Sequence, residues 1–200
     1  NRDTTKTADM NGDRIQDLVF LENDTCYYYP GKGYGRYGNK TYFDYPPNNV
    51  LDSARLFLAD VNGDGLADAV YVGDTLRMWL NLGLNPANPA RAQFADPISF
   101  ATSLLNNFSH FRQADMNGNG STDIVWNTEY DTLAYLDFTG DEQPYQLKTI
   151  TNGIGLTTTI TYGSSVDEMF RDRQNGNPWT QWAPFPLPVI VRVEAYDGVN

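Results

Sequence analysis

Short runs of apolar, β-branched and aromatic residues alternate along the chain with clusters of Gly, Asn, Asp and Pro. Three pairs of such runs recur in the same order: 18–21 with 26–29, 69–72 with 76–80, and 124–126 with 133–136. Runs of this length, bounded by turn residues, are typical of β-strands. The sequence therefore predicts an all-β fold built from repeated strand pairs, with a further strand before each pair, as at 54–59.

A nine-residue polar loop of the pattern D-x-N-G-D/N-x-x-x-D precedes each strand pair. The loops begin at Asp9, Asp60 and Asp115, intervals of 51 and 55 residues. Internal similarity at a period of about 50 residues indicates a repeat array or a β-propeller. Three units are fewer than the 4–8 blades of a typical closed propeller, so the prediction is a partial β-propeller of about three blades.

The same loops predict calcium binding. Calcium takes about 6–8 oxygen ligands, which alternate loop positions and one backbone carbonyl can supply. Glycine at the fourth position lets the chain fold back with positive φ. The candidate ligands, with carbonyls at the seventh position, are Asp9, Asn11, Asp13, Ile15, Asp17, Asp60, Asn62, Asp64, Leu66, Asp68, Asp115, Asn117, Asn119, Ser121 and Asp123.

The loops also allow two other interpretations. An EF-hand would carry a bidentate Glu at position twelve and continue into a helix, whereas these loops have Phe20, Tyr71 and Trp126 there and continue into strands. Asp and Asn also form turns by accepting backbone N–H groups without any metal. The third loop, with Asn119 in place of Asp, offers one carboxylate fewer and is expected to bind calcium most weakly.

The pattern changes after about residue 142. Strands at 147–150 and 156–162 flank an Asn152-Gly153 turn, which predicts a β-hairpin, and 189–196 is a further strand. The charged stretch 167–173 is expected to be a solvated turn. The segment 85–89 is expected to be a loop, because two prolines disfavour a helix or a central strand, and 103–108 a short helical turn.

Composition excludes several classes of function. A net charge of −11 opposes binding to nucleic acid, and no apolar run reaches the ~20 residues of a membrane span. Cys26 is the only cysteine and His110 the only histidine, and both are expected to pack rather than react. No signal peptide is visible at the polar start, so any targeting signal is expected outside this segment. We expect no enzyme activity.

Tyrosines are concentrated between Tyr27 and Tyr45. Tyr27 and Tyr29 alternate with Tyr28 along a strand, so one face is expected to pack against the next blade. For Tyr34, Tyr37 and their neighbours a sugar- or protein-binding surface is equally consistent. This leaves open the alternative of a calcium-stabilised adhesin or lectin-like propeller that binds cell-surface glycans or proteins.

The loop-strand-turn-strand units resemble FG-GAP/VCBS repeats, which form blades of β-propellers. The segments 147–162 and 184–194 are similar to part of insecticidal toxin-complex (Tc) B components and SpvB-like virulence proteins. The resemblance implies propeller blades over 1–142 and, over 143–200, a strand extension toward an Rhs-like shell. It also implies a secreted, extracellular bacterial protein.

In such B components the propeller docks on a channel-forming A-like component, and the shell encloses a toxin carried by a C-like component. The resemblance therefore implies a non-catalytic assembly module with these two partners. It implies neither nucleic-acid binding nor membrane insertion by this segment. The ADP-ribosyl transfer of SpvB-like proteins belongs to a separate domain.

Overall fold

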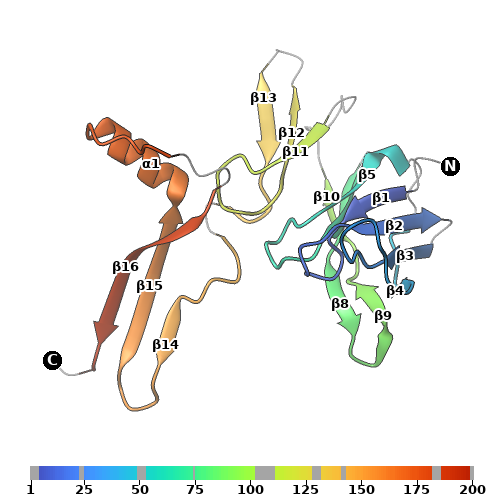
Figure 1. Ribbon diagram of the computed structural model, residues 1–200, viewed down its shortest axis with the longest axis horizontal. Coiled ribbons are helices and arrows are strands. Elements are labelled where there is room, and N and C mark those ends of the chain that lie inside the picture. The colour runs from blue at the N-terminus through green and yellow to red at the C-terminus, as the bar shows by residue number, and fades with distance from the viewer. Residues whose placement is uncertain are drawn as a thin grey trace.

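The computed structural model describes residues 5–22, 25–48, 53–73, 75–101, 111–127, 132–140, 143–181 and 186–198. Within these ranges the chain forms four β-sheets and one α-helix, and the sheets follow one another along the molecule (Figure 1). The predicted all-β class and partial propeller are confirmed. His110 and the segment 103–108, for which packing and a helical turn were expected, lie outside the described residues.

Three antiparallel units share one strand order, with the polar loop between the first and second strands. Their strands are β1 Thr5–Ala8, β2 Asp17–Glu22 and β3 Thr25–Tyr29; β5 Leu56–Ala59, β6 Asp68–Val72 and β7 Thr75–Trp79; and β11 Phe111–Ala114, β12 Asp123–Asn127 and β13 Leu133–Leu136. The strand predicted before each loop is therefore present. We call these units the first, second and third blades.

Additional strands widen the first two blades. In the first sheet, β4 Thr41–Asp44 pairs with β3 and then, in parallel, with β9 Asn88–Phe94, which forms a hairpin with β8 Asn81–Asn85. In the second sheet, β10 Ile98–Ala101 pairs with β7, and a 3-10 helix, η2 Ser53–Arg55, leads into β5.

The β8–β9 hairpin corrects the expected loop at 85–89. Pro89 is the second residue of β9, but it lies where the register between β8 and β9 is irregular, and β4 pairs only with Arg91–Gln93. Proline cannot donate a ladder hydrogen bond. At this position none is required of it, so the proline does not prevent the strand.

Two hydrophobic clusters hold the blades together. In the first, Val19, Cys26 and Tyr28 of the first blade pack with residues of the second blade such as Leu58 and Trp79. In the second, the opposite face of the second blade packs around Ile124 of the third blade. The strand alternation predicted for the tyrosines is confirmed, because Tyr28 enters the core whereas Tyr27 and Tyr29 lie on the other face with Phe20.

The chain after the third blade forms a separate three-stranded sheet. Its strands are β14 Thr149–Thr151, β15 Thr157–Ser164 and β16 Pro188–Tyr196, in the order β14-β15-β16. The predicted hairpin and final strand are thus present. Many of its apolar side chains are exposed, among them Ile150, Ile190 and Val193. We call residues 143–198 the extension.

A helix replaces the solvated turn expected at 167–173. Helix α1, Ser165–Gln174, begins where the Ser164 hydroxyl accepts the N–H of Val166. Acidic residues occupy its first turn and Arg171 and Arg173 its last, which favours the helix dipole. Glu168 and Arg171 form an ion pair one turn apart. These end effects stabilise a helix whose apolar face consists of only Val166, Met169 and Phe170.

Candidate functional site

The first polar loop, 9–17, is closed by its own side chains. Asp9 Oδ1 accepts the N–H of Gly12 at 2.8 Å, and Asp9 Oδ2 accepts that of Arg14 at 2.6 Å. Asn11 Oδ1 accepts the N–H of Asp13, and its amide donates to Asp13 Oδ2 at 3.0 Å. The side chains at positions one, three and five of the loop therefore point toward one another. They do so in a hydrogen-bonded turn of the kind that Asx residues form without a metal.

The second loop, 60–68, repeats this arrangement. Asp60 accepts the N–H groups of Gly63 at 2.7 Å and Gly65 at 2.8 Å, and the Asn62 amide donates to Asp64 Oδ2 at 3.1 Å. Burial raises the pKa of Asp60, opposed by its backbone N–H donors and assisted by the like charge of Asp64. Asp13 and Asp64 are both exposed. The charged rim of each loop thus faces solvent.

The aspartate at position nine has a different task, which is to anchor the loop to the strands. Both oxygens of the buried Asp17 accept backbone N–H groups, from Met10 at 2.9 Å and Gly31 at 2.8 Å. Asp68 does the same with Val61 at 3.1 Å and Asn81 at 2.8 Å. Burial raises the pKa of Asp68 to about 7 against the effect of these two N–H donors, and it raises the pKa of Asp17 as well.

The loops also connect neighbouring blades. The N–H of Ala67, position eight of the second loop, donates to the carbonyl of Asp9 at 2.8 Å, and the N–H of Thr122 in the third loop donates to the carbonyl of Asp60 at 3.0 Å. The buried amide of Asn81 adds bonds to the carbonyls of Met10 and Ala67. Each loop therefore binds the next at equivalent positions.

The third loop, 115–123, is bonded to a following turn rather than exposed. Asn119 is only 7% exposed, and its amide donates to Thr139 Oγ1 at 2.9 Å and to the carbonyl of Gly140 at 2.6 Å. The amide of Asn117 donates to Asp137 Oδ2 at 2.8 Å. A carboxylate has no N–H to donate. The substitution that weakened the metal prediction is therefore what permits this contact.

Asp123 lacks one of the two bonds that its counterparts make. Its Oδ2 accepts the N–H of Met116 at 2.7 Å, whereas its buried Oδ1 has no partner within the described residues. Burial raises the pKa of Asp123, and Asp137 and Asp115 raise it further. The third loop is therefore held less completely at its strand end, and more firmly at its outer end, than the first two.

The loop glycines provide contact surface for the segment that follows the third blade. A Cβ added at Gly63 would lie 3.0 Å from Pro144 Cδ, one at Gly120 2.9 Å from Gln143 Nε2, and one at Gly118 3.1 Å from Ser164 Oγ. The segment 143–145 and the end of β15 therefore pack closely on the second and third loops.

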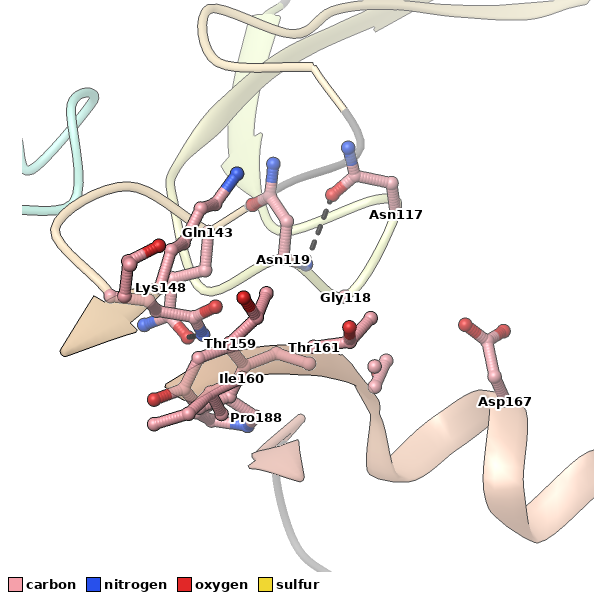
Figure 2. A pocket seen from close by; sticks show the side chains of 15 residues that line it. Asn117, Gly118, Asn119, Gln143, Lys148, Thr159, Ile160, Thr161, Asp167 and Pro188 are labelled. Atoms are coloured by element: carbon pink, nitrogen blue, oxygen red, sulfur yellow. Dashed lines mark hydrogen bonds between the residues drawn. The ribbon is translucent and has the colours of Figure 1, made fainter. Parts of the chain in front are cut away.

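A polar cavity of about 720 Å³ lies between the third loop and the extension (Figure 2). Asn117, Gly118 and Asn119 line one side. The other side comes from the segment before β14, from β15 between Thr159 and Ser164, and from Asp167 of α1. Most of the lining residues carry an amide or a hydroxyl, beside apolar residues such as Ile160 and Pro188.

The three loops fit calcium to different degrees. Within the described ranges, no three His, Cys, Asp or Glu side chains come together in a way that could hold a metal ion. In the first two loops, an ion would also require the Asn11 or Asn62 amide oxygen and a backbone carbonyl, and these oxygen donors suit calcium. In the third loop, Asn119 Oδ1 already accepts both the N–H and the hydroxyl of Ser121. Calcium thus stays a prediction, and the first two loops fit it better than the third.

Two residues important to this site were missed from the sequence. Asn81 precedes Gly83, whose N–H its side chain accepts, and Asp137 caps the turn to Gly140 in the same way. Both belong to short Asx-turn patterns, a signal that was available but gives no indication of the long-range partners.

Cys26 is fully buried, and burial raises the pKa of its thiol, as expected for a packing residue. No helix in the described part of the chain is long and apolar enough to cross a membrane.

Comparison with known proteins adds family information. A model of the insecticide toxin TcdB middle/N-terminal region matches residues 81–200, and a model of an FG-GAP-like repeat matches residues 9–71. No curated protein matches.

Among solved structures, a TcdB2–TccC3 crystal structure is similar with a TM-score of 0.77 and 23% identity, over 97% of this chain and 10% of that one. The structure of a Photorhabdus luminescens Tc holotoxin pore gives 0.76 and 22%, over 96% and 9%. At this identity the similarity is one of fold, and the chain spans about a tenth of the length of these relatives.

Proposed function

Because this chain belongs to the insecticide toxin TcdB middle/N-terminal family, we propose that it is a non-catalytic assembly module of a toxin-complex B-like protein. The blades would dock on a channel-forming A-like component, and the extension would lead into a shell around the toxin of a C-like component. The resemblance to such B components and to FG-GAP repeats is confirmed by the family matches.

The observation that carries this proposal is the junction between blades and extension. The family match begins at residue 81, in the hairpin that widens the first blade's sheet, and continues through the third blade and the whole extension. Close approaches of Gly63 to Pro144 and of Gly120 to Gln143 bring the second and third loops against the start of the extension. Asn119 bonds the third loop to the turn at Gly140, just before the extension. Such a packed joint between a docking unit and a shell suits an assembly module.

We base the proposed partners and location on the solved structures to which the chain is similar. Those structures contain TcdB2 with TccC3 and a Tc holotoxin pore. For this chain we propose other toxin-complex components as partners and an extracellular place of action. The buried Cys26 thiol and the structural use of the position-nine aspartates support a role without catalysis.

Cross-linking mass spectrometry of the assembled complex tests this function. The whole B-like protein would be mixed with its A-like and C-like components and treated with a lysine-reactive reagent. The exposed Lys32 and Lys40 report on the blades and the exposed Lys148 on the extension. We expect links from the two blade lysines to the A-like component and from Lys148 to the C-like component. The reverse assignment, or no link to either, would refute the proposal.

Calcium in the first two loops is the second element of the proposal. An ion there would neutralise the exposed carboxylates at the loop rims and brace the bonds between blades. At about 100 times its dissociation constant, an ion that binds only the folded state stabilises it by roughly 2.7 kcal/mol per site. Thermal unfolding with calcium and with chelator should show this shift in the wild type and lose it in Asp13→Asn/Asp64→Asn.

Glycan binding is a second candidate function, and one observation favours it. Tyr34 is 98% exposed between two glycines with positive φ, and Tyr37 is half exposed beside it. An exposed aromatic ring on a glycine turn suits stacking on a sugar. A glycan array probed with the wild type and with Tyr34→Ala would detect it. Signals unaffected by the substitution would exclude this surface.

A further inference from the structure

The edge of β15 that faces β14 is only partly paired. β14 pairs with β15 at Thr157, Thr158 and Thr159, and the N–H of Ile160 donates to the carbonyl of Lys148 at 2.8 Å. On its other edge, β15 pairs with β16 as far as Ser164. Within the described residues, no strand pairs with the β14 side of β15 beyond Ile160.

The chain itself leaves this edge because of a turn at Pro144 and Tyr145. Tyr145 has a φ of +60°, which no strand residue adopts. Pro144 has no N–H, and it packs against Gly63 of the second loop. The segment that would continue β14 alongside Tyr162 and Ser164 is therefore held away on the blades, and the polar cavity opens in its place.

Alternation along a strand determines which backbone groups face this cavity. The register shift after Thr161 leaves its extra residue, Val191, on β16, so the alternation along β15 continues. Because Ile160 bonds toward β14, the N–H and carbonyl of Tyr162 and the N–H of Ser164 point to the same side. An unpaired strand edge is a template for another strand. An extended polypeptide is the ligand whose donors and acceptors match this spacing, as in recognition by β-strand addition.

The cavity lining defines the chemistry of such a peptide. The exposed Thr159 and Thr161 of β15 present hydroxyls to it, whereas the amide of Asn119 is already bonded within the protein. Lys148 and Asp167 lie at opposite ends of the row of Thr159, Ile160 and Thr161 (Figure 2). A strand antiparallel to β15 would start near Asp167 and run toward Lys148, so a basic residue at its amino end complements the charge.

We propose that this cavity binds an extended segment of a partner polypeptide, which adds to the edge of β15 at Tyr162 and Ser164 and carries small polar residues after an amino-terminal basic residue. The proposal deepens the assembly role and rests on it, since it assumes a polypeptide partner. Cross-links from the exposed Lys32 and Lys40 report that role away from this cavity, so the two can fail separately.

The test uses a blocked pentapeptide, acetyl-Lys-Thr-Val-Thr-Thr-amide, titrated into the ¹⁵N-labelled protein. We expect chemical-shift changes at the cavity and slower exchange of the Tyr162 and Ser164 amides. The reversed sequence reports strand direction, and a peptide N-methylated at alternate residues removes the backbone bonds. Loss of about two hydrogen bonds should weaken binding roughly tenfold or more.

Substitutions in the protein complete the test. Asp167→Asn should weaken the lysine peptide about twofold to fivefold, the range of an exposed ion pair, and should not affect a peptide with Gln in place of Lys. Asp96→Asn changes an exposed aspartate between β9 and β10, away from the cavity, and is the matched control. No shift changes at millimolar peptide, changes located elsewhere, or equal binding of the N-methylated peptide would overturn the proposal.

Discussion

The first two loops and the third share one sequence pattern but make different contacts. In the first two, the carboxylates at position five are exposed, and both oxygens of the position-nine aspartate accept backbone N–H groups. In the third, position five is the buried Asn119, bonded to the turn at 139–140, and Asp123 keeps one buried oxygen without a partner in the described chain.

The difference shows how one repeat element serves two tasks. A charged loop end cannot be buried against carbonyl oxygens without a large desolvation cost. Replacing one carboxylate with an amide removes that cost and supplies N–H donors. The third loop is therefore bonded to the turn at 139–140, whereas the first two keep exposed carboxylates that can meet a cation.

Removing the position-nine aspartate should give the largest effect and separate the two kinds of loop. Asp68→Ala leaves the buried N–H groups of Val61 and Asn81 without an acceptor, which should cost about 3 kcal/mol or more of unfolding free energy. Asp123→Ala removes one such bond and should cost roughly 1–2 kcal/mol. Urea unfolding measures both. Equal losses would mean that the hydrogen bond missing at the unpaired oxygen of Asp123 does not change the free energy of unfolding.

The raised pKa of Asp68 should make the free energy of unfolding depend on pH. Burial raises its pKa in the folded state to about 7, above the value near 4 of an unfolded chain. The folded state thus holds a proton that the unfolded state has released, so stability falls as pH rises between these values, by up to about 1.4 kcal/mol per pH unit.

The burial-raised pKa values of Asp17, Asp60 and Asp123 act in the same direction. Urea titrations in chelator between pH 4 and 8 would show the slope, and Asp68→Asn is the control that should flatten it. An unchanged slope in that variant would assign the pH dependence to other groups.

Exchanging amide and carboxylate at position five should destabilise the third loop much more than the second. Asn119→Asp replaces two N–H donors with a carboxylate facing the Gly140 carbonyl, and should cost about 2 kcal/mol. Asp64→Asn, the reciprocal change at an exposed site, should alter stability by no more than about 0.5 kcal/mol without calcium. Thermal unfolding in chelator compares them, and a similar loss in both would contradict the division of tasks.

The smallest expected effect concerns the glycines. Gly63 and Gly33 both have positive φ, but only Gly63 faces a neighbour, Pro144. Alanine at Gly33 should cost about 1 kcal/mol for the left-handed backbone alone. Gly63→Ala should cost more and should increase hydrogen exchange in the segment 143–148. Equal costs and unchanged exchange would show that the segment is not held by the second loop.

Much of the fold could be predicted because its signals are local. The strands, the Asn152-Gly153 hairpin and the repeat period all follow from alternation and turn residues within a few positions. Helix α1 was missed because its apolar face consists of only Val166, Met169 and Phe170, beside capping and charge at its ends. The β8–β9 hairpin was missed because only the irregular register makes Pro89 acceptable there.

The sequence predicts which residues belong to the site, but not which residues they contact. The sequence identifies the loop oxygens, yet it gives no indication that Asn81 bonds to Met10, 71 residues away. Nor does it reveal that Asn119 serves the turn at 139–140. Such bonds depend on which blades become neighbours, and that is decided by the packing of the strand faces.

A crystal grown with terbium in place of calcium, with anomalous scattering recorded, tests the division between the loops most directly. Terbium binds oxygen sites of the calcium kind and scatters strongly enough to be located without ambiguity. We predict anomalous peaks within the loops 9–17 and 60–68 and none within 115–123. A peak in the third loop, or none in the first two, would contradict the account.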